Sequence, residues 1–190
     1  LAASATAGVL PTVTNGFNIE AATVAPGSST ILLGFRAPLQ NTTLRNRALV
    51  IPATNLTSVI DAGAGTVTFG TPALLDLGGR AIRSMDTTSS GQVLILAGPV
   101  DNRIAGQEAN TFKFFLWDGN PATSPTPLTS SLDDIAANSA GGPEAVFDLP
   151  ATLTNGGSVG ILVDNGSTDH YGTFQESKDL TANWQKFRAD

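Results

Sequence analysis

Short apolar runs separated by glycine- and proline-containing turns recur along the chain. The first two, residues 19–25 and 30–35, flank the turn Pro26-Gly27-Ser28-Ser29. Strand-length apolar runs on either side of a Pro-Gly turn predict a β-hairpin. Residues 47–52 predict a third strand of the same sheet. Residues 66–69 and 73–77 then supply a fourth strand and the approach to the next unit.

The same pattern returns twice. Residues 81–86, 93–98 and 112–117 predict a second set of strands, and residues 143–147 and 159–164 begin a third. The second strands start at Ile31, Val93 and Val159, which are 62 and 66 positions apart. Recurrence of a three- or four-stranded unit at a nearly fixed period is typical of a β-propeller. An ordinary β-sandwich with coincidentally spaced hairpins is the alternative.

We therefore predict an all-β chain that forms a partial β-propeller of about three to four blades. The blade-like repeats are expected at about 17–76, 77–140 and 141–190 of a single unit. Residues 120–131, with three prolines, predict a surface loop. A helix is expected only near 131–137 or 178–184, and 184–188 alternates like a strand.

Composition narrows the partners. The net charge is −6 without a cluster of Lys or Arg, so nucleic acid is a poor partner. No apolar run is long enough to span a bilayer. Cysteine is absent, which excludes disulfides and thiolate metal sites. Few lysines among many Thr, Ser and Asn favour a periplasmic or secreted protein, from which we expect any signal peptide to have been removed.

Three blades do not close a ring, and an open edge exposes unpaired strand groups and half a core. We therefore expect the missing N-terminal half of the propeller, or a second copy of this chain, as the partner. The start at Leu1, without methionine, favours processing or proteolysis.

Several strings carry a resemblance to a known family. They are Asn18-Ile19-Glu20, Leu33-Gly34-Phe35-Arg36-Ala37-Pro38-Leu39, Arg47-Ala48-Leu49-Val50, residues 75–84, Ile95-Leu96-Ala97-Gly98-Pro99, Leu116-Trp117-Asp118-Gly119, Pro143-Glu144-Ala145-Val146 and residues 162–166. Over residues 17–190 the chain resembles the C-terminal half of a bacterial β-propeller family of unknown function, similar to the esterase-like phytase domain. The resemblance implies a propeller and export. The family's pattern has glycine after the glutamates, where Ala21 and Ala145 stand here.

Four charged residues are the candidate ligand-binding site. Glu20, Arg83 and Glu144 stand at the start of the first strand of each repeat, the strand that lines the channel of a propeller. We expect these side chains to face one another, either as a ligand or metal site or as an ion network joining blades. Arg36 could hold a phosphate or carboxylate, or pair with Glu20 across the hairpin.

A second candidate is a metal site at Asp164 and Asp169, whose oxygens surround a glycine turn of the kind that Ca²⁺ accepts. The alternative is an Asx-type turn. The single histidine, His170, is the only base available for a Ser-His-Asp triad, but no Gly-x-Ser-x-Gly motif presents a serine. Trp117 and Trp184 are expected in blade cores, with a stacking platform for a ligand as the alternative.

Two functions follow. The favoured one is an exported binding or scaffold module whose ligand lies over the channel mouth. The alternative is a metal-dependent phosphoesterase of the phytase or esterase-like kind, in which metal-bound carboxylates activate water against a phosphate ester.

Overall fold

The structure is a computed structural model that describes residues 11, 16–40, 46–100, 112–132, 142–154, 156–166, 172, 175–176, 179–181 and 188–189. The strands of these residues form three antiparallel sheets. The first sheet consists of β1 (Asn18–Val24), β2 (Ile31–Ala37), β3 (Ala48–Ala53) and β4 (Ala73–Leu75). The middle sheet consists of β5 (Ala81–Thr87), β6 (Val93–Gly98), β7 (Lys113–Trp117) and β8 (Thr126–Ser131). The third sheet consists of β9 (Gly142–Phe147), β10 (Gly160–Asp164) and β11 (Arg188–Ala189).

This architecture confirms the prediction of an all-β chain. In each of the three sheets every strand pairs with the next one along the sequence. The three sheets fall within the ranges 17–76, 77–140 and 141–190. No helix among the described residues is long and apolar enough to cross a membrane.

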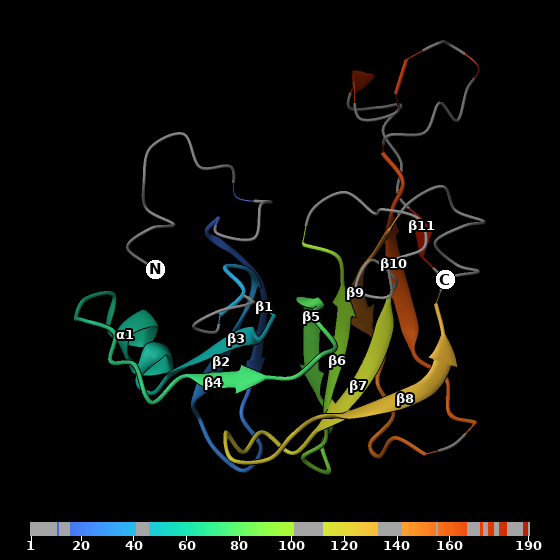
Figure 1. Ribbon diagram of the computed structural model, residues 1–190. Helices are drawn as coiled ribbons and strands as arrows, with labels where there is room; N and C mark the ends of the chain where they lie inside the picture. The colour runs from blue at the N-terminus through green and yellow to red at the C-terminus, as the bar shows by residue number, and fades with distance from the viewer. Residues whose placement is uncertain are drawn as a thin grey trace.

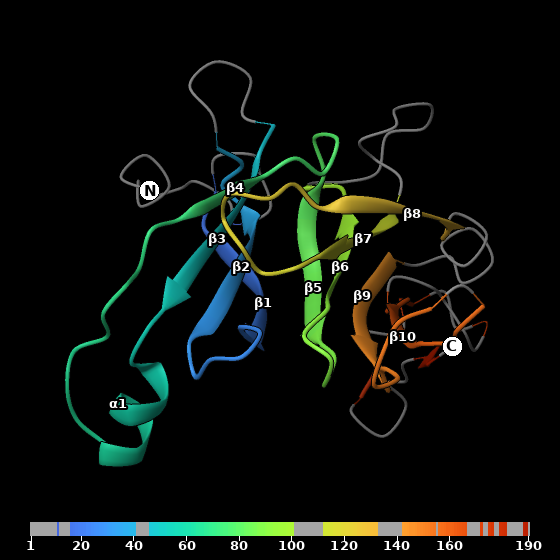
Figure 2. The ribbon, with the colours of Figure 1, turned by 90° about the horizontal axis from the view of Figure 1, so that it is seen from below.

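The first strands of the three sheets lie side by side. Figures 1 and 2 show β5 between β1 and β9, with the later strands of the first two sheets extending away from this row. Contacts between β1 and β5 and between β5 and β9 join the sheets along these strands. The middle sheet is therefore packed on both sides.

β6 shows how the sequence produces this double packing. All six of its residues are buried. Val93, Ile95 and Ala97 belong to the core shared with the first sheet, whereas Leu94 and Leu96 belong to the core shared with the third. Because successive side chains of a strand point to opposite faces, a strand covered on both faces needs a continuous apolar run.

The contact between the first two sheets depends on a missing side chain at Gly34 in β2. A Cβ there would lie 2.8 Å from Met85 Cε, 2.9 Å from Ile82 Cγ2 and 3.0 Å from Ala21 Cβ. These distances are too short for real Cβ contacts, so glycine lets β5 approach the first sheet closely.

Three local predictions are corrected. The helix α1 (Leu56–Ala62) was not expected; it has only seven residues, fewer than the window over which a helical period is recognised, and none of them is buried. The fourth strand of the first sheet is β4, not residues 66–69, where Phe69 forms only an isolated bridge with Ala53. The predicted loop 120–131 contains β8, which pairs with β7 although it includes Pro127. β8 is the last strand of its sheet, a place where proline is tolerated.

Candidate functional site

The first strand of each sheet carries a β-bulge at its third residue. In β1 the pairing passes from Ile19 to Ala21 and leaves Glu20 out of register. Arg83 in β5 and Glu144 in β9 are left out of their registers in the same way. A bulge bends and twists its strand and redirects the side chain of the extra residue. The three charged residues therefore occupy one repeated position of the fold.

Arg83 lies between the two glutamates. Its Nη2 donates a hydrogen bond to Glu144 Oε1, and its Nε lies 3.5 Å from Glu20 Oε2. Its Nη1 donates to the backbone oxygen of Pro99 at 3.2 Å. The side chain is only 5% exposed. One buried guanidinium thus links strands of all three sheets.

The aliphatic and planar parts of Arg83 are packed as well. The Arg83 Cζ lies 5.9 Å from the centroid of the Phe112 ring, within the range of a cation–π interaction. Gly98 makes room for this ring, because a Cβ there would lie 2.5 Å from Phe112 Cε1 and 3.2 Å from Arg83 Cγ. Packing on several sides fixes the orientation of the guanidinium.

Arg36, near the end of β2, completes the group. Its Nη1 donates to Glu20 Oε1 at 2.9 Å and its Nε donates to the backbone oxygen of Val100 at 2.6 Å. Asn18 Nδ2 donates to the same Oε1 of Glu20, also at 2.9 Å. Arg36 therefore pairs with Glu20 across the hairpin, which was one of its two interpretations. We call Glu20, Arg36, Arg83 and Glu144 the charged cluster.

Exposure differs among the four side chains. Arg83 and Arg36 are 5% and 15% exposed, whereas Glu20 and Glu144 are 20% and 31% exposed. Glu144 is thus the most exposed of the four side chains and Arg83 the most buried. Burial raises the pKa of Glu144 above its ordinary value of 4.5, although the positive charge of Arg83 partly opposes the rise, while the negative charge of Glu20 adds to it.

This order favours one kind of ligand. Both arginines donate to backbone and carboxylate oxygens, and their side chains are only 5% and 15% exposed, so little of either guanidinium is open to an anion. Glu144 is the most exposed side chain of the charged cluster, and its carboxylate acts only as an acceptor when ionised. Glu20 is less open, because its Oε2 is buried and its Oε1 already accepts from Arg36 and Asn18. A group that brings positive charge suits Glu144 better than a phosphate.

The predicted metal turn is only partly within the structure. Asp164 ends β10, and its Oδ1 accepts a hydrogen bond from the backbone N–H of Gly166 at 2.9 Å, as in an Asx-type turn. Asp169 lies outside the described residues. In the part of the chain that the structure describes, no three His, Cys, Asp or Glu side chains are grouped to hold a metal ion.

The other residues considered from the sequence also fall partly inside and partly outside the described part of the chain. His170 and Trp184 lie outside the described residues, as does most of each segment in which a helix was expected. Trp117 is 3% exposed in the core between the first and middle sheets, with Nε1 donating to the backbone oxygen of Asn120 at 3.0 Å. A buried ring of this kind packs the core and offers no stacking platform.

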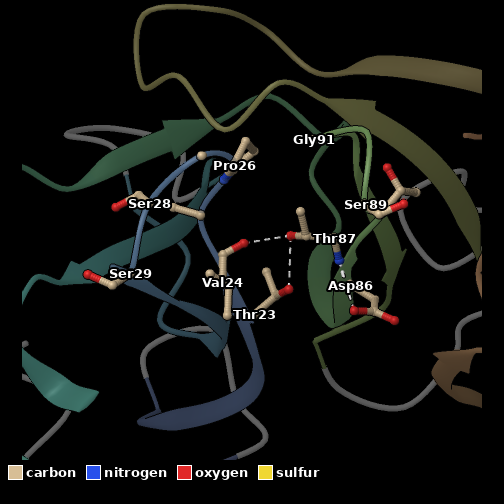
Figure 3. A pocket seen from close by; sticks show the side chains of 12 residues that line it. Thr23, Val24, Pro26, Ser28, Ser29, Asp86, Thr87, Ser89 and Gly91 are labelled. Atoms are coloured by element: carbon tan, nitrogen blue, oxygen red, sulfur yellow. Dashed lines mark hydrogen bonds between the residues drawn. The ribbon is translucent and has the colours of Figure 1, made fainter. Parts of the chain in front are cut away.

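A depression among the described residues lies at the opposite end of β1 and β5. It has a volume of about 690 Å³ and is lined by the β1–β2 and β5–β6 turns. Figure 3 shows Thr23 and Thr87 within it, their Oγ1 atoms 2.9 Å apart, and Thr87 also donating to the backbone oxygen of Val24 at 2.8 Å. None of the four charged residues lines this depression.

Sequence reasoning missed the partners that orient the arginines. The backbone oxygens of Pro99 and Val100 follow β6 directly and accept from Arg83 and Arg36. Phe112 directly precedes β7 and lies against Arg83. The sequence shows that residues 99 and 100 directly follow a buried strand. It does not show that their backbone oxygens accept hydrogen bonds from the arginines, because every residue type carries such an oxygen.

Comparison of the chain with protein-family models, with curated proteins and with solved structures finds no match. The resemblance to the phytase-like propeller family is neither supported nor contradicted by these comparisons. The case for a function therefore depends on the geometry of the charged cluster.

Proposed function

We propose that this chain is an exported β-propeller segment that acts as a binding module, with the charged cluster as its ligand site. The observation that carries this proposal is the repeated β-bulge, which directs Glu20, Arg83 and Glu144 toward one another from three different sheets. Bulges that redirect side chains are frequent next to functional sites.

The propeller is supported by the sheets themselves. The first two are antiparallel with sequential strand order, and all three pack in series through their first strands. In a propeller the first strands line a central channel. The charged cluster would then lie at the mouth of that channel, where a ligand could reach several repeats at once.

The ligand that fits the charged cluster carries a positive charge, such as a primary amine. Glu144 is its most exposed member, and burial raises the pKa of Glu144 although the positive charge of Arg83 opposes the rise. A cation placed against the Glu144 carboxylate would favour its charged form.

Isothermal titration of the chain with 1,5-diaminopentane, calcium chloride and sodium phosphate tests this proposal. We expect the diamine to bind and phosphate not to bind. Glu144→Gln should weaken diamine binding at least tenfold, because it removes the charge and keeps the shape. Asp76→Asn is the matched control, since Asp76 is a half-exposed carboxylate paired with Arg47 outside the charged cluster.

The outcomes separate a ligand site from a purely structural ion network. Loss of binding in Glu144→Gln with an unchanged melting temperature supports the ligand site. A lower melting temperature with no measurable binding by wild-type protein of any of the three probes would show that the charged cluster only joins the sheets, and the proposal would be wrong.

The phosphoesterase alternative is not favoured by any observation on the described residues. It stays a prediction that one assay decides. Release of 4-nitrophenol from 4-nitrophenyl phosphate in the presence of calcium, abolished by Glu144→Gln, would replace the binding proposal with the hydrolytic one.

A further inference from the structure

The first sheet has a second apolar face that no described sheet covers. Along β1, Ile19 and Val24 are 42% and 48% exposed on this face, and Ala22 is exposed between them. Leu74, on β4 at the other edge of the sheet, is 50% exposed, whereas its partner Leu49 is buried and Leu33, which pairs with Ala22, is half-buried. Exposed apolar side chains gathered along one strand mark an interaction site more often than an ordinary sheet surface does.

The pairing register shows which faces of the middle and third sheets correspond to this face of the first sheet. In the first strand of each sheet, the second residue after the β-bulge holds the same position. These residues are Ala22, Met85 and Val146. Met85 is 4% exposed in the core with the first sheet, and Val146 is 7% exposed in the core with the middle sheet. In two of the three sheets this position is therefore buried against the preceding sheet. Only Ala22 lacks a preceding sheet within the described residues.

The residues directly after the bulge define the opposite face. Ala21 lies in the core toward the middle sheet, and Ser84 Oγ accepts a hydrogen bond from the backbone N–H of Val146 in the third sheet at 3.3 Å. This position thus faces the following sheet. In the third sheet it is held by Ala145, which is half-buried, and the next outward residue, Phe147, is 40% exposed.

The uncovered face of the first sheet and that of the third sheet therefore correspond to the two sides of the contact between successive sheets. This contact already occurs twice inside the molecule. Within the described residues, no preceding sheet packs on the first sheet and no following sheet packs on the third. We propose that a second copy of this chain supplies the missing sheet, so that the third sheet of one copy packs head to tail on the first sheet of the next. A single chain carries both complementary faces, and no other partner is needed to satisfy either of them.

This inference does not depend on the ligand of the charged cluster. It is tested with three matched Ala→Lys substitutions. Ala22→Lys places a charge on the uncovered face of the first sheet, and Ala145→Lys places one on the uncovered face of the third. Ala62→Lys, at the exposed end of α1, is the control. Sedimentation velocity over a range of protein concentrations measures association, and circular dichroism verifies that each variant is folded.

Wild type and Ala62→Lys should associate, whereas Ala22→Lys and Ala145→Lys should each sediment mainly as monomers. An equimolar mixture of these two variants should recover a 1:1 complex, because each retains the face that the other has lost. A wild-type protein that remains monomeric at every concentration would overturn the proposal. So would a face-to-face dimer, in which one variant still associates by itself and mixing restores nothing.

Discussion

Arg83 and Glu20 are the third residues of neighbouring strands, and Arg83 Nε lies 3.5 Å from Glu20 Oε2 across the contact between the first and middle sheets. Both atoms are buried and neither has a hydrogen-bond partner, so each is compensated chiefly by the charge of the other. Charges held in this way depend strongly on one another, because removal of one leaves the other desolvated and unpaired.

Replacement of Arg83 by methionine should therefore be strongly destabilising. Arg83→Met keeps much of the side-chain volume but leaves Glu20 and Glu144 without their shared cation. We expect the free energy of unfolding to fall by about 3–5 kcal/mol, the range found when one partner of a buried ion pair is removed. Urea denaturation followed by tryptophan fluorescence measures the loss.

Arg47→Met is the matched control for that substitution. Arg47 Nη1 lies 2.5 Å from Asp76 Oδ2, but the two side chains are 37% and 52% exposed. Exposed ion pairs contribute about 0–1 kcal/mol. Equal losses in Arg83→Met and Arg47→Met would show that burial of the charged cluster adds nothing to its strength.

The raised pKa of Glu144 predicts a pH dependence of stability. The folded protein holds this proton to a higher pH than the unfolded chain, whose carboxyl titrates near the ordinary value of 4.5. Stability contributed by Glu144 is thus fully present below pH 4.5 and is lost as the pH rises through the folded pKa. The free energy of unfolding of wild type minus that of Glu144→Gln should decrease over this interval.

Chemical denaturation of both proteins between pH 4 and 7 measures this difference. Subtraction removes the contributions of carboxyl groups that the two proteins share. A difference that increases with pH would mean that Arg83 lowers the pKa of Glu144 more than burial raises it.

The sequence predicted most strands because their patterns are local. Residues 93–98 form an unbroken apolar run, and this run is β6, which is buried on both faces. The turn at Pro26-Gly27 likewise separates two strands that pair in the structure. The meeting of Glu20, Arg83 and Glu144 was predictable because all three hold the same place in their repeats.

The sequence could not show how these side chains are brought together. A β-bulge at Glu20 arises from the pairing of β1 with β2 and has no residue signature of its own. The burial of Glu144, which raises its pKa, depends on packing between distant segments. α1 spans only seven residues, too few for a helical period to be distinguished from a connecting segment.

The close approach of the first two sheets predicts that Gly34→Ala is destabilising. The added methyl would meet the branched side chain of Ile82 and the Cβ of Ala21, neither of which can rotate away as the end of Met85 can. Overpacking of this kind costs about 1–3 kcal/mol. Gly70→Ala is the control, because its nearest neighbour is Pro52 Cβ at 3.4 Å. Thermal unfolding should show a clear loss for Gly34→Ala and little change for Gly70→Ala.

At the other end of the same contact, two hydroxyl groups hold the sheets together. Thr23 Oγ1 donates to Thr87 Oγ1, which donates in turn to the backbone oxygen of Val24 (Figure 3). Thr87→Val removes both hydrogen bonds and should reduce the free energy of unfolding by about 1–2 kcal/mol. Thr23→Val removes only the first bond and should have a smaller effect.

Because Thr23 and Thr87 share that bond, the double variant should lose less than the sum of the single losses, as a double-mutant cycle of urea unfolding would show. Strictly additive losses would mean that the two hydroxyls do not interact in solution.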